Sequence, residues 1–434
     1  MLTTPVEEPL KLLRAMLNQA ILRALPEQHL ARHLPKPPKG RTLVLGAGKA
    51  AASMAMALEK HWPSDAPLSG LVVTRYGHVP ELDGAASLRV EIMQAAHPVP
   101  DEQSVEASRR MFELTKGLTQ DDLVIALISG GGSSLLTLPA LGMSLAQKQA
   151  LNRNLLRCGA SISEINCVRK HLSAIKGGRL AKACAPARLV TLCISDVPGD
   201  DPATIASGPT VADESTCEEA LAVIQKYQLQ LPDALLEALR SKALETPKEH
   251  ELRAFAQEVR VIATPKDSLE AAAAYAQTKG LRSYILSDEI EGESKDVALV
   301  HAALAKACAK GWGPFTKPCV LLSGGETTVT LGQEKALGRG GRAGEFCLSL
   351  AKSLGSSSNV WALAADTDGI DGVEDNAGAY VDPHTLQRAQ SLGLQVDDFL
   401  SRHDAYGFFE AVEGLVITGP TYTNVNDFRA ILIL

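Results

Sequence analysis

The chain has 434 residues, of which 45% are hydrophobic and only 4% aromatic, so it is long enough for two domains with cores built mainly from aliphatic side chains. Its formal net charge is -7, which argues against the concentrated basic face that a nucleic acid or an anionic membrane would require. We therefore expect a cytoplasmic protein that handles small molecules.

Three further features agree with this expectation. Glu7 and Glu8 lie in an amphipathic N-terminal stretch without a long apolar core, so we predict neither a secretory signal nor a membrane anchor. The 25-residue uncharged run 123–147 contains three consecutive glycines and Pro139, which favours a buried strand and loop over a membrane span. The eight cysteines form no C-x-x-C pair, and we expect free, buried thiols.

Short apolar runs alternate with helical patterns in the first half of the chain. Strands are predicted over 42–45, 71–74, 123–128 and 189–194, with helices over 49–60 and 101–116 between them. This alternation predicts right-handed βαβ units, and hence a Rossmann-like domain with a mostly parallel sheet. Ligands are then expected at the carboxyl ends of its strands.

A long polar loop over 195–210 follows, and then helices over 217–227 and 233–244. The charged stretch 246–253 is the predicted linker to a second α/β domain. Strands of that domain are expected over 258–263, 281–286, 318–322, 360–365 and 415–418. We thus predict domains at 1–245 and 255–434, with the active site in the cleft between them.

The first glycine motif is G-A-G-K-A-A, Gly46 to Ala51, where a predicted strand meets a helix. Gly46 and Gly48 suit the tight turn of a dinucleotide loop, but Thr74-Arg75 stands at the end of the second strand in place of a ribose-binding acid. Lys49 places an ammonium group at a helix start, where an anionic ligand would explain it.

A second glycine motif, Ser129-Gly130-Gly131-Gly132-Ser133-Ser134, follows a buried strand. Its backbone amides and hydroxyls could converge on a phosphate oxyanion, although it lacks the lysine of a Walker loop. The run Gly324-Gly325-Glu326 follows a strand and a serine in the same way. We therefore expect each domain to offer a glycine loop to a shared cleft.

Acidic residues follow two predicted strands: Asp196, Asp200 and Asp201 in one loop, and Asp366, Asp368 and Asp371 in the other. Carboxylates together with phosphate oxygens are the usual ligands of Mg²⁺ at nucleotide sites.

The loop 338–345 carries Arg339 and Arg342 before a helical run, and the guanidinium fork fits carboxylate or phosphate. We expect His97, in A-H-P-V-P-D, to be a loop histidine without a chemical role.

Taken together, the motifs resemble one family, the class II glycerate kinases, whose C-terminal part is called MOFRL. The N-terminal part carries A-G-K-A-A, A-A-H-P-V-P-D, I-S-G-G-G-S-S, K-G-G-R-L and S-D-V-P-G-D-D, and the C-terminal part S-G-G-E-T-T-V-T, G-R-G-G-R, D-T-D-G-I-D-G and T-G-P-T-Y-T-N-V-N-D. Two departures stand out: Ala343-Gly344 replaces the usual Asn-Gln, and Tyr422 replaces a usual glycine.

The resemblance implies that Lys49, Asp196, Arg342 and Asp368 fall on the family's active-site positions and that the cleft takes glycerate and ATP. We expect Ser129–Ser134 to bind nucleotide phosphate, Lys49 to neutralise the transferring phosphoryl group, and Arg342 to bind the substrate carboxylate or the γ-phosphate. Asp196 or Asp368 would hold Mg²⁺ or take the proton from the 2-hydroxyl.

Two alternatives remain open at this stage. An NADP-dependent hydroxypyruvate or tartronate-semialdehyde reductase would use Gly46–Ala51 as its dinucleotide loop, and relatives of the family have carried such names. A non-catalytic metabolite-binding protein would keep the cleft without turnover. The sequence leaves open 2- against 3-phosphorylation, nucleotide preference and oligomeric state, a homodimer among the options.

Overall fold

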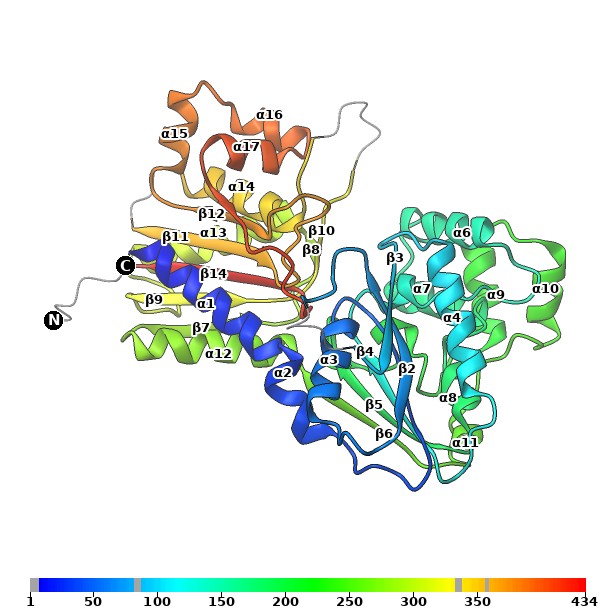
Figure 1. Cartoon of the computed structure of the whole chain (residues 1–434). Coiled ribbons are helices and arrows are strands. Elements are labelled where there is room, and N and C mark those ends of the chain that lie inside the picture. The colour runs from blue at the N-terminus through cyan, green and yellow to red at the C-terminus, as the bar shows by residue number, and fades with distance from the viewer. Residues whose placement is uncertain (1–7, 82–86, 332–337, 356–358) are drawn as a thin grey trace. The chain divides into compact units, whose positions relative to one another are not determined.

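The computed structural model describes residues 8–81, 87–331, 338–355 and 359–434, which form two compact units (Figure 1). The N-terminal unit contains the described residues of 26–196 and 200–262, and the C-terminal unit those of 1–25, 197–199 and 263–434. Both units are of α/β type, as predicted. In the part of the chain that the structure describes, every helix is too short or too polar to span a lipid bilayer.

The N-terminal unit is built on a six-stranded sheet with the order β3-β2-β1-β4-β5-β6. β1 pairs in parallel with β2 and β4, and the pairs β2–β3 and β4–β5 are also parallel. Every residue of β1 and β4 is buried, as expected for strands that are covered on both faces. The strands are β1 Thr42–Ala47, β2 Leu68–Arg75, β3 Val90–Ala95, β4 Leu123–Ile128, β5 Arg188–Ile194 and β6 Gln257–Ala263.

Helices surround this sheet, and some of them form a separate apolar cluster. α3 packs against β2 and β4, whereas α4 packs against β2 and β3. Residues from α6, α7, α9 and α10 share one core cluster. The helices of the unit are α2 Pro26–His29, α3 Ala51–His61, α4 Glu102–Thr115, α5 Gly132–Leu135, α6 Leu145–Arg157, α7 Ile162–His171, α8 Arg179–Cys184, α9 Cys217–Lys226, α10 Asp233–Arg240 and α11 Glu249–Leu252.

The C-terminal unit has a mixed sheet with the order β13-β12-β11-β14-β9-β7. β14 lies near its centre and runs antiparallel to both β11 and β9, while β7 pairs in parallel with β9. The strands are β7 Arg282–Ser287, β9 Cys319–Ser323, β11 Val360–Asp366, β12 Gly378–Val381, β13 Leu415–Val416 and β14 Asp427–Ile433; a separate short pair consists of β8 Gly292–Glu293 and β10 Thr327–Thr328.

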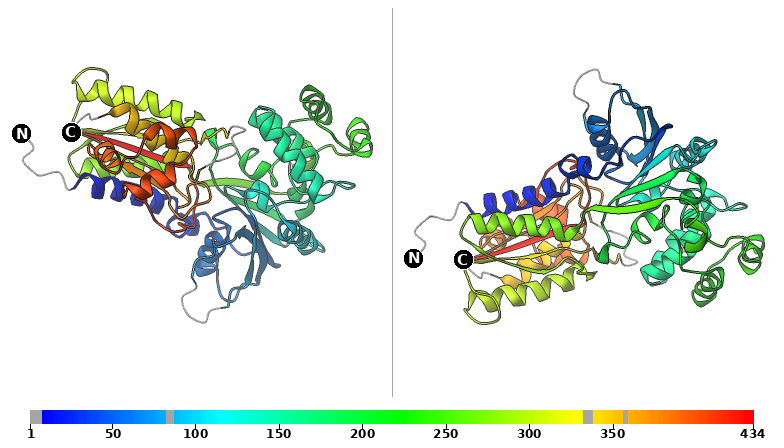
Figure 2. Two further views of the ribbon diagram at one scale, coloured as in Figure 1. Left: turned by 90° about the horizontal axis from the view of Figure 1, so that it is seen from above. Right: turned by 90° about the horizontal axis from the view of Figure 1, so that it is seen from below.

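Helices cover both faces of this second sheet. One core cluster joins the sheet to α1 and α12, and the other joins it to α13, α14 and α17. The two views of Figure 2 show α1 and α12 side by side on one face. The helices of the unit are α1 Pro9–Ala24, α12 Pro265–Thr278, α13 Ser294–Ala309, α14 Arg342–Leu354, α15 Thr385–Ser391, α16 Val396–Ser401 and α17 Ala405–Ala411.

The first helix therefore belongs to the C-terminal unit. Its apolar stripe includes Leu13, Met16 and Leu17, which are buried in the same cluster as the α12 residues. The Thr423 hydroxyl donates to the carbonyl of Ala24 at 2.8 Å, at the end of the helix. An amphipathic pattern predicts that a helix has a buried face but not which sheet buries it.

The strand expected over 258–263 was assigned to the wrong sheet. It forms β6, the edge strand next to β5 in the N-terminal unit, and the Leu189 amide donates to the carbonyl of Ala256 at 2.9 Å just before it. The expected linker 246–253 contains α11, where Leu252 is buried and Glu251 pairs with Lys182 at 2.6 Å. Its charges belong to a solvated helix face rather than to a linker.

Candidate active site

The glycine turn after β1 is closed by bonds to the neighbouring loop. The Lys49 amide donates to the carbonyl of Gly130 at 2.8 Å, and the Ala50 amide donates to the Ser129 hydroxyl at 3.0 Å. The Gly48 amide donates to the carbonyl of Val73 at 3.2 Å. Three amides that a dinucleotide loop would turn toward pyrophosphate are thus already used within the protein.

Only glycine fits at position 48. Its φ is +138°, and a Cβ there would lie 2.1 Å from the Ser129 hydroxyl oxygen. The two glycine motifs of the N-terminal unit therefore form one packed structure rather than two separate turns. The turn Gly46–Ala51 thus supports the loop Ser129–Ser134.

The loop Ser129–Ser134 follows β4 and leads into α5. Gly131 precedes that helix with φ 77°. Within the described ranges, the amides of Gly130 and Gly131 donate to no atom of the chain, so both stay available to an anion. The Gly132 amide donates to the carbonyl of Ser129 at 3.2 Å.

Lys49 and His97 lie beside this loop. A Cβ on Gly131 would be 3.1 Å from Lys49 Cγ and also 3.1 Å from the His97 ring. Lys49 is only 8% exposed, although lysine side chains are mostly exposed in folded proteins. The structure therefore brings the predicted lysine next to the predicted phosphate loop, together with a histidine for which no role was expected.

Three buried residues beneath the loop escaped the sequence analysis. The hydroxyl groups of Ser133 and Ser207 are 2.8 Å apart, and Ser207 in turn donates to Asn166 Oδ1 at 3.2 Å. Lys176 Nζ donates to the carbonyl of Ser133 at 2.8 Å. The string K-G-G-R-L was noticed as a motif, but it gave no indication of what its lysine contacts.

In the C-terminal unit, Arg342 at the start of α14 is surrounded by three carboxylates. Its Nη1 lies 2.6 Å from Glu326, its Nη2 2.8 Å from Asp366 and its Nε 2.6 Å from Asp427. Burial alone would lower the pKa of Arg342, but the charges of Asp427, Asp366 and Glu326 outweigh it and raise that pKa well above its usual value. The guanidinium group is therefore permanently charged.

A second arginine supports this cluster. Arg429 on β14 is 1% exposed, pairs with Asp427, and donates to the carbonyl of Gly324 at 2.8 Å and to the Thr327 hydroxyl at 3.1 Å. It thereby links β14 to the Gly324-Gly325-Glu326 turn. At Gly325, φ is +105° and a Cβ would lie 2.2 Å from the Ile290 amide nitrogen, so only glycine fits this turn.

The acidic loop after β11 is buried rather than solvated. Asp368 is 0% exposed, and its Oδ1 accepts from the Ile370 amide at 2.8 Å. Asp371 accepts from the amides of Ala343 and Gly344 at 2.9 and 2.7 Å, so it caps α14 from outside that helix. Burial raises the pKa of Asp371 to about 7, against the opposing effect of these amide donors.

The predicted metal ligands lie in different units. Asp196 follows β5 in the N-terminal unit, and Asp368 follows β11 in the C-terminal unit. Their joint role therefore stays a prediction.

A separate group, His171, Cys217 and Glu245, has its potential ligand atoms within 4.8 Å of one another. Lys248 pairs with Glu245 at 2.7 Å, and the Cys217 amide donates to the same carboxylate at 3.0 Å. This group is a satisfied ion pair rather than a metal site.

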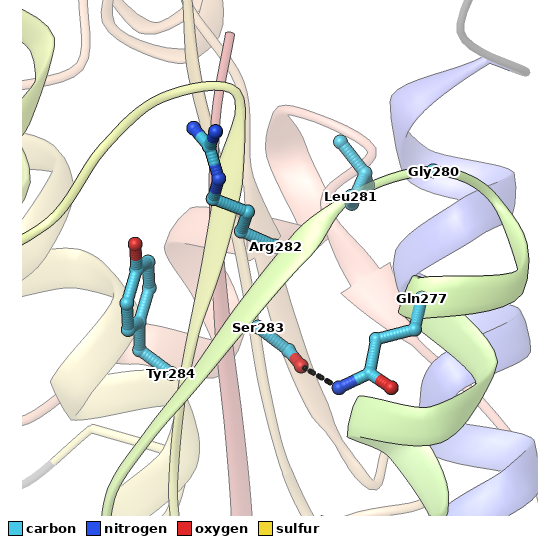
Figure 3. A pocket seen from close by; sticks show the side chains of 6 residues that line it. All are labelled: Gln277, Gly280, Leu281, Arg282, Ser283 and Tyr284. Atoms are coloured by element: carbon cyan, nitrogen blue, oxygen red, sulfur yellow. Dashed lines mark hydrogen bonds between the residues drawn. The ribbon is translucent and has the colours of Figure 1, made fainter.

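A pocket of the C-terminal unit lies away from these residues. It is lined by the end of α12 and by the first residues of the edge strand β7 (Figure 3): Gln277, Gly280, Leu281, Arg282, Ser283 and Tyr284. Gln277 Nε2 donates to the Ser283 hydroxyl at 3.1 Å. No carboxylate and no glycine loop takes part in its lining, so we assign it no role in catalysis.

Two family profiles match the chain. The family described as "Domain of unknown function (DUF4147)" covers residues 12–240, and the MOFRL family covers residues 319–427. D-glycerate 2-kinase of Thermotoga maritima is 38% identical over 98% of this chain and 98% of its own. The chain belongs to the class II glycerate kinase family.

Other comparisons agree with this membership. The crystal structure of glycerate kinase from Thermotoga maritima matches with a TM-score of 0.84 and 37% identity, and covers 99% of this chain and 100% of that chain. A protein of Agrobacterium vitis that carries the provisional name hydroxypyruvate reductase is 52% identical, over 98% of this chain and 94% of its own. Members of one family therefore bear the names of two different activities.

One departure from the family pattern has a structural explanation. Tyr422, which replaces the usual glycine, has φ 62°, a left-handed conformation that glycine adopts at no steric cost. The position requires this backbone geometry whichever residue occupies it. Gly344, in place of the usual glutamine, would have its Cβ 3.1 Å from both Ala405 Cβ and Asp371 Oδ2, and therefore a larger side chain would need room from both.

Proposed function

We propose that this protein is a glycerate 2-kinase that transfers the γ-phosphoryl group of ATP to the 2-hydroxyl of D-glycerate in the presence of Mg²⁺. The observation that carries the proposal is the full-length likeness, in sequence and in structure, to the D-glycerate 2-kinase of Thermotoga maritima and its glycerate kinase structure. Phosphoryl transfer also demands positioning and charge neutralisation more than covalent chemistry. Lysine, arginine, carboxylates and glycine amides are suited to that task.

The geometry of the glycine turns favours a kinase over a reductase. The amides of Gly48, Lys49 and Ala50 are bonded within the protein, which leaves few donors for the pyrophosphate of a nicotinamide dinucleotide. The amides of Gly130 and Gly131, by contrast, donate to no atom of the described chain. They support a role for Ser129–Ser134 in binding nucleotide phosphate.

The remaining roles follow from charge. Lys49, whose stem lies against Gly131, would neutralise the transferring phosphoryl group. Arg342 would bind the γ-phosphate or the substrate carboxylate, and for this it must exchange at least one of its three carboxylate partners. Glu326 is the most exposed partner, with 47% of its side chain accessible, and so it is the one most easily displaced.

Mg²⁺ fits the donor chemistry of the acidic residues. Asp196 and Asp368 offer hard carboxylate oxygens at the carboxyl ends of strands, which suit Mg²⁺ better than softer ions. Either carboxylate would hold the ion, and the other would take the proton from the 2-hydroxyl. The ion would neutralise charge on the phosphate oxygens. A cytoplasmic location is part of the proposal, since all eight thiols are free and all but Cys158 are buried.

Purified protein incubated with D-glycerate, ATP and Mg²⁺ tests the proposal. Phosphorus NMR should show ADP and 2-phosphoglycerate, and a Lys49→Met variant prepared in the same way should give neither above background. The appearance of 3-phosphoglycerate would overturn the assigned position. Oxidation of NADPH by hydroxypyruvate, without ATP turnover, would establish the reductase instead.

A further inference from the structure

A buried lysine lies directly under the loop Ser129–Ser134. Lys176 is 1% exposed, and its Nζ donates to the carbonyl oxygens of Ser133 and Leu136, both at 2.8 Å. Both carbonyl groups belong to α5 or to the residue that ends it. Burying an amine is costly unless it is hydrogen-bonded, so this lysine must meet a structural need.

That need comes from the length of α5. A helix of four residues, Gly132–Leu135, is far too short to be stable alone, and its last carbonyl groups have no partners within it. The Leu136 amide bonds to the carbonyl of Gly132 at 2.8 Å, and the Thr137 hydroxyl bonds to that of Ser134, also at 2.8 Å. Lys176 supplies donors for two further carbonyls.

The backbone around Lys176 is fixed as well. The Gly177 amide donates to the carbonyl of Ser207 at 3.1 Å, and the Gly178 amide to that of Gly208 at 2.8 Å. Ser207 has φ 62°, a strained conformation that only firm surroundings maintain, and its hydroxyl lies 2.8 Å from that of Ser133. One rigid segment therefore holds both the carbonyl and the hydroxyl of Ser133.

We propose that Lys176 is a positioning residue for phosphoryl transfer: it fixes α5 so that the Gly130 and Gly131 amides and the Ser133 hydroxyl keep the geometry that receives phosphate oxygens. The inference rests on the proposed function, because the presence of nucleotide phosphate at this loop is part of that proposal. Lys176 itself touches no substrate in this scheme. It acts through the loop.

The chain provides a matched control. Lys148 is 2% exposed, and its Nζ also bonds to two main-chain carbonyls, those of Arg169 at 3.2 Å and Leu172 at 2.9 Å. These carbonyls lie at the end of α7, outside the glycine loop. Methionine in place of either lysine removes a buried amine that donates to two carbonyls, and among the described residues only the Leu172 carbonyl then keeps another donor, the Ala140 amide at 3.3 Å. Both variants should therefore lose stability, which makes Lys148→Met a control for the loss of a buried amine.

The experiment compares Lys176→Met with Lys148→Met for Tm, kcat and the KM values for ATP and D-glycerate. Both variants should show a lower Tm. Lys176→Met should lose about tenfold or more in kcat/KM for ATP, since small displacements of positioning groups are costly, and its KM for D-glycerate should change less. Lys148→Met should stay within about twofold of the wild type, because its partners lie outside the loop. Equal kinetic losses in the two variants at equal loss of Tm would overturn the proposal.

A second variant covers the case in which Lys176→Met does not fold. Ser207→Ala removes the hydroxyl that meets Ser133 and that also donates to Asn166 Oδ1. It should raise the KM for ATP by about threefold to tenfold, because one of these two hydrogen bonds is made to the loop; an unchanged KM overturns the proposal.

If the wild-type protein phosphorylates no glycerate, the proposed function fails, and binding of inorganic pyrophosphate by calorimetry then decides the role of Lys176. Binding weakened about tenfold in Lys176→Met but not in Lys148→Met supports positioning. Equal binding by the two variants, or none by the wild type, overturns it.

Discussion

Arg342→Met should destabilise the C-terminal unit as well as abolish activity. The side chain of Arg342 is 19% exposed, while the side chains of Asp366 and Asp427 are 7% and 1% exposed. Removal of the guanidinium group leaves Asp366 without this partner, whereas Asp427 keeps Arg429. An arginine in a glycine-rich loop would ordinarily be exposed, and its loss would then change stability little. The burial of this cluster predicts a large loss instead.

The magnitude follows from burial. Breaking a buried ion pair by removing one partner costs about 3–5 kcal/mol, whereas the exposed pair with Glu326 contributes at most about 1 kcal/mol. For a folding unit of this size, each kcal/mol lowers the Tm by about 2–4 °C. We therefore expect a loss of about 10 °C. If Arg342 binds the γ-phosphate or the substrate carboxylate as proposed, kcat should also fall about 10²-fold or more.

Arg339 provides the control for this prediction. It lies in the same glycine-rich loop, but its side chain is 53% exposed and pairs with Glu410 at 3.1 Å and Glu374 at 3.7 Å on the surface. Arg339→Met should lower the Tm far less than Arg342→Met, because exposed ion pairs contribute little to stability, and it should leave kcat unchanged. The assay is thermal and urea unfolding of both variants beside glycerate-dependent ADP release. If the two variants lost equal Tm, or if Arg342→Met kept its Tm within about 2 °C, the buried ion-pair argument would be refuted.

Three further predictions concern the glycine loop, the metal and the core of the C-terminal unit. Gly131→Ala places a Cβ on a left-handed residue (φ +77°) beside Lys49 and should lower kcat at least about tenfold. Gly142→Ala, at φ +87° with open space around it, should lower stability only. Equal effects of the two variants on kcat would contradict the packing argument. Chelation by EDTA should abolish activity, and Asp368→Asn should raise the Mg²⁺ concentration needed for half-maximal rate; an unchanged requirement would exclude Asp368 as a ligand. Burial lowers the pKa of His301 from 6.5 to about 4, so the folded protein holds the ring neutral. The free energy of unfolding should therefore be highest above pH 6.5 and fall by about 3 kcal/mol as the pH falls from 6.5 to 4. In urea unfolding, the His301→Gln variant should not show this part of the pH dependence.

The sequence predicted most of the strands that carry the site. β1, β4, β5, β9 and β11 are continuous apolar runs, and their buried patterns bear this out. Such strands can be predicted without knowledge of tertiary contacts, because a strand covered on both faces is apolar throughout. The candidate functional loops follow directly, since they begin where these strands end. The loop Ser129–Ser134 and the acids after β11 were found in this way.

The residues that support the site could not be predicted by the same reasoning. β14 was missed, although its sequence D-F-R-A-I-L-I is mostly apolar and all of it is buried. A charged pair such as Asp427 and Arg429 usually indicates solvent, but here each is satisfied by the other and by the turn after β9. The buried position of Lys176 could not be predicted for the same reason. Burial of a charge depends on partners that are distant in sequence, and local patterns do not contain them.

The position of α1 affects how the chain is made. α1 ends at residue 24 and leaves the ribosome long before its partners α12, β11 and β14, which begin at residues 265, 360 and 427. At about 5–20 residues per second, the apolar face of α1 waits roughly 10–50 s for α12 and longer for the sheet. During that time the intervening unit, residues 26–196 and 200–262, can fold first. Premature termination before α12 would release a chain in which the apolar face of α1 has no partner, and such an exposed face is a natural target for chaperones and proteases.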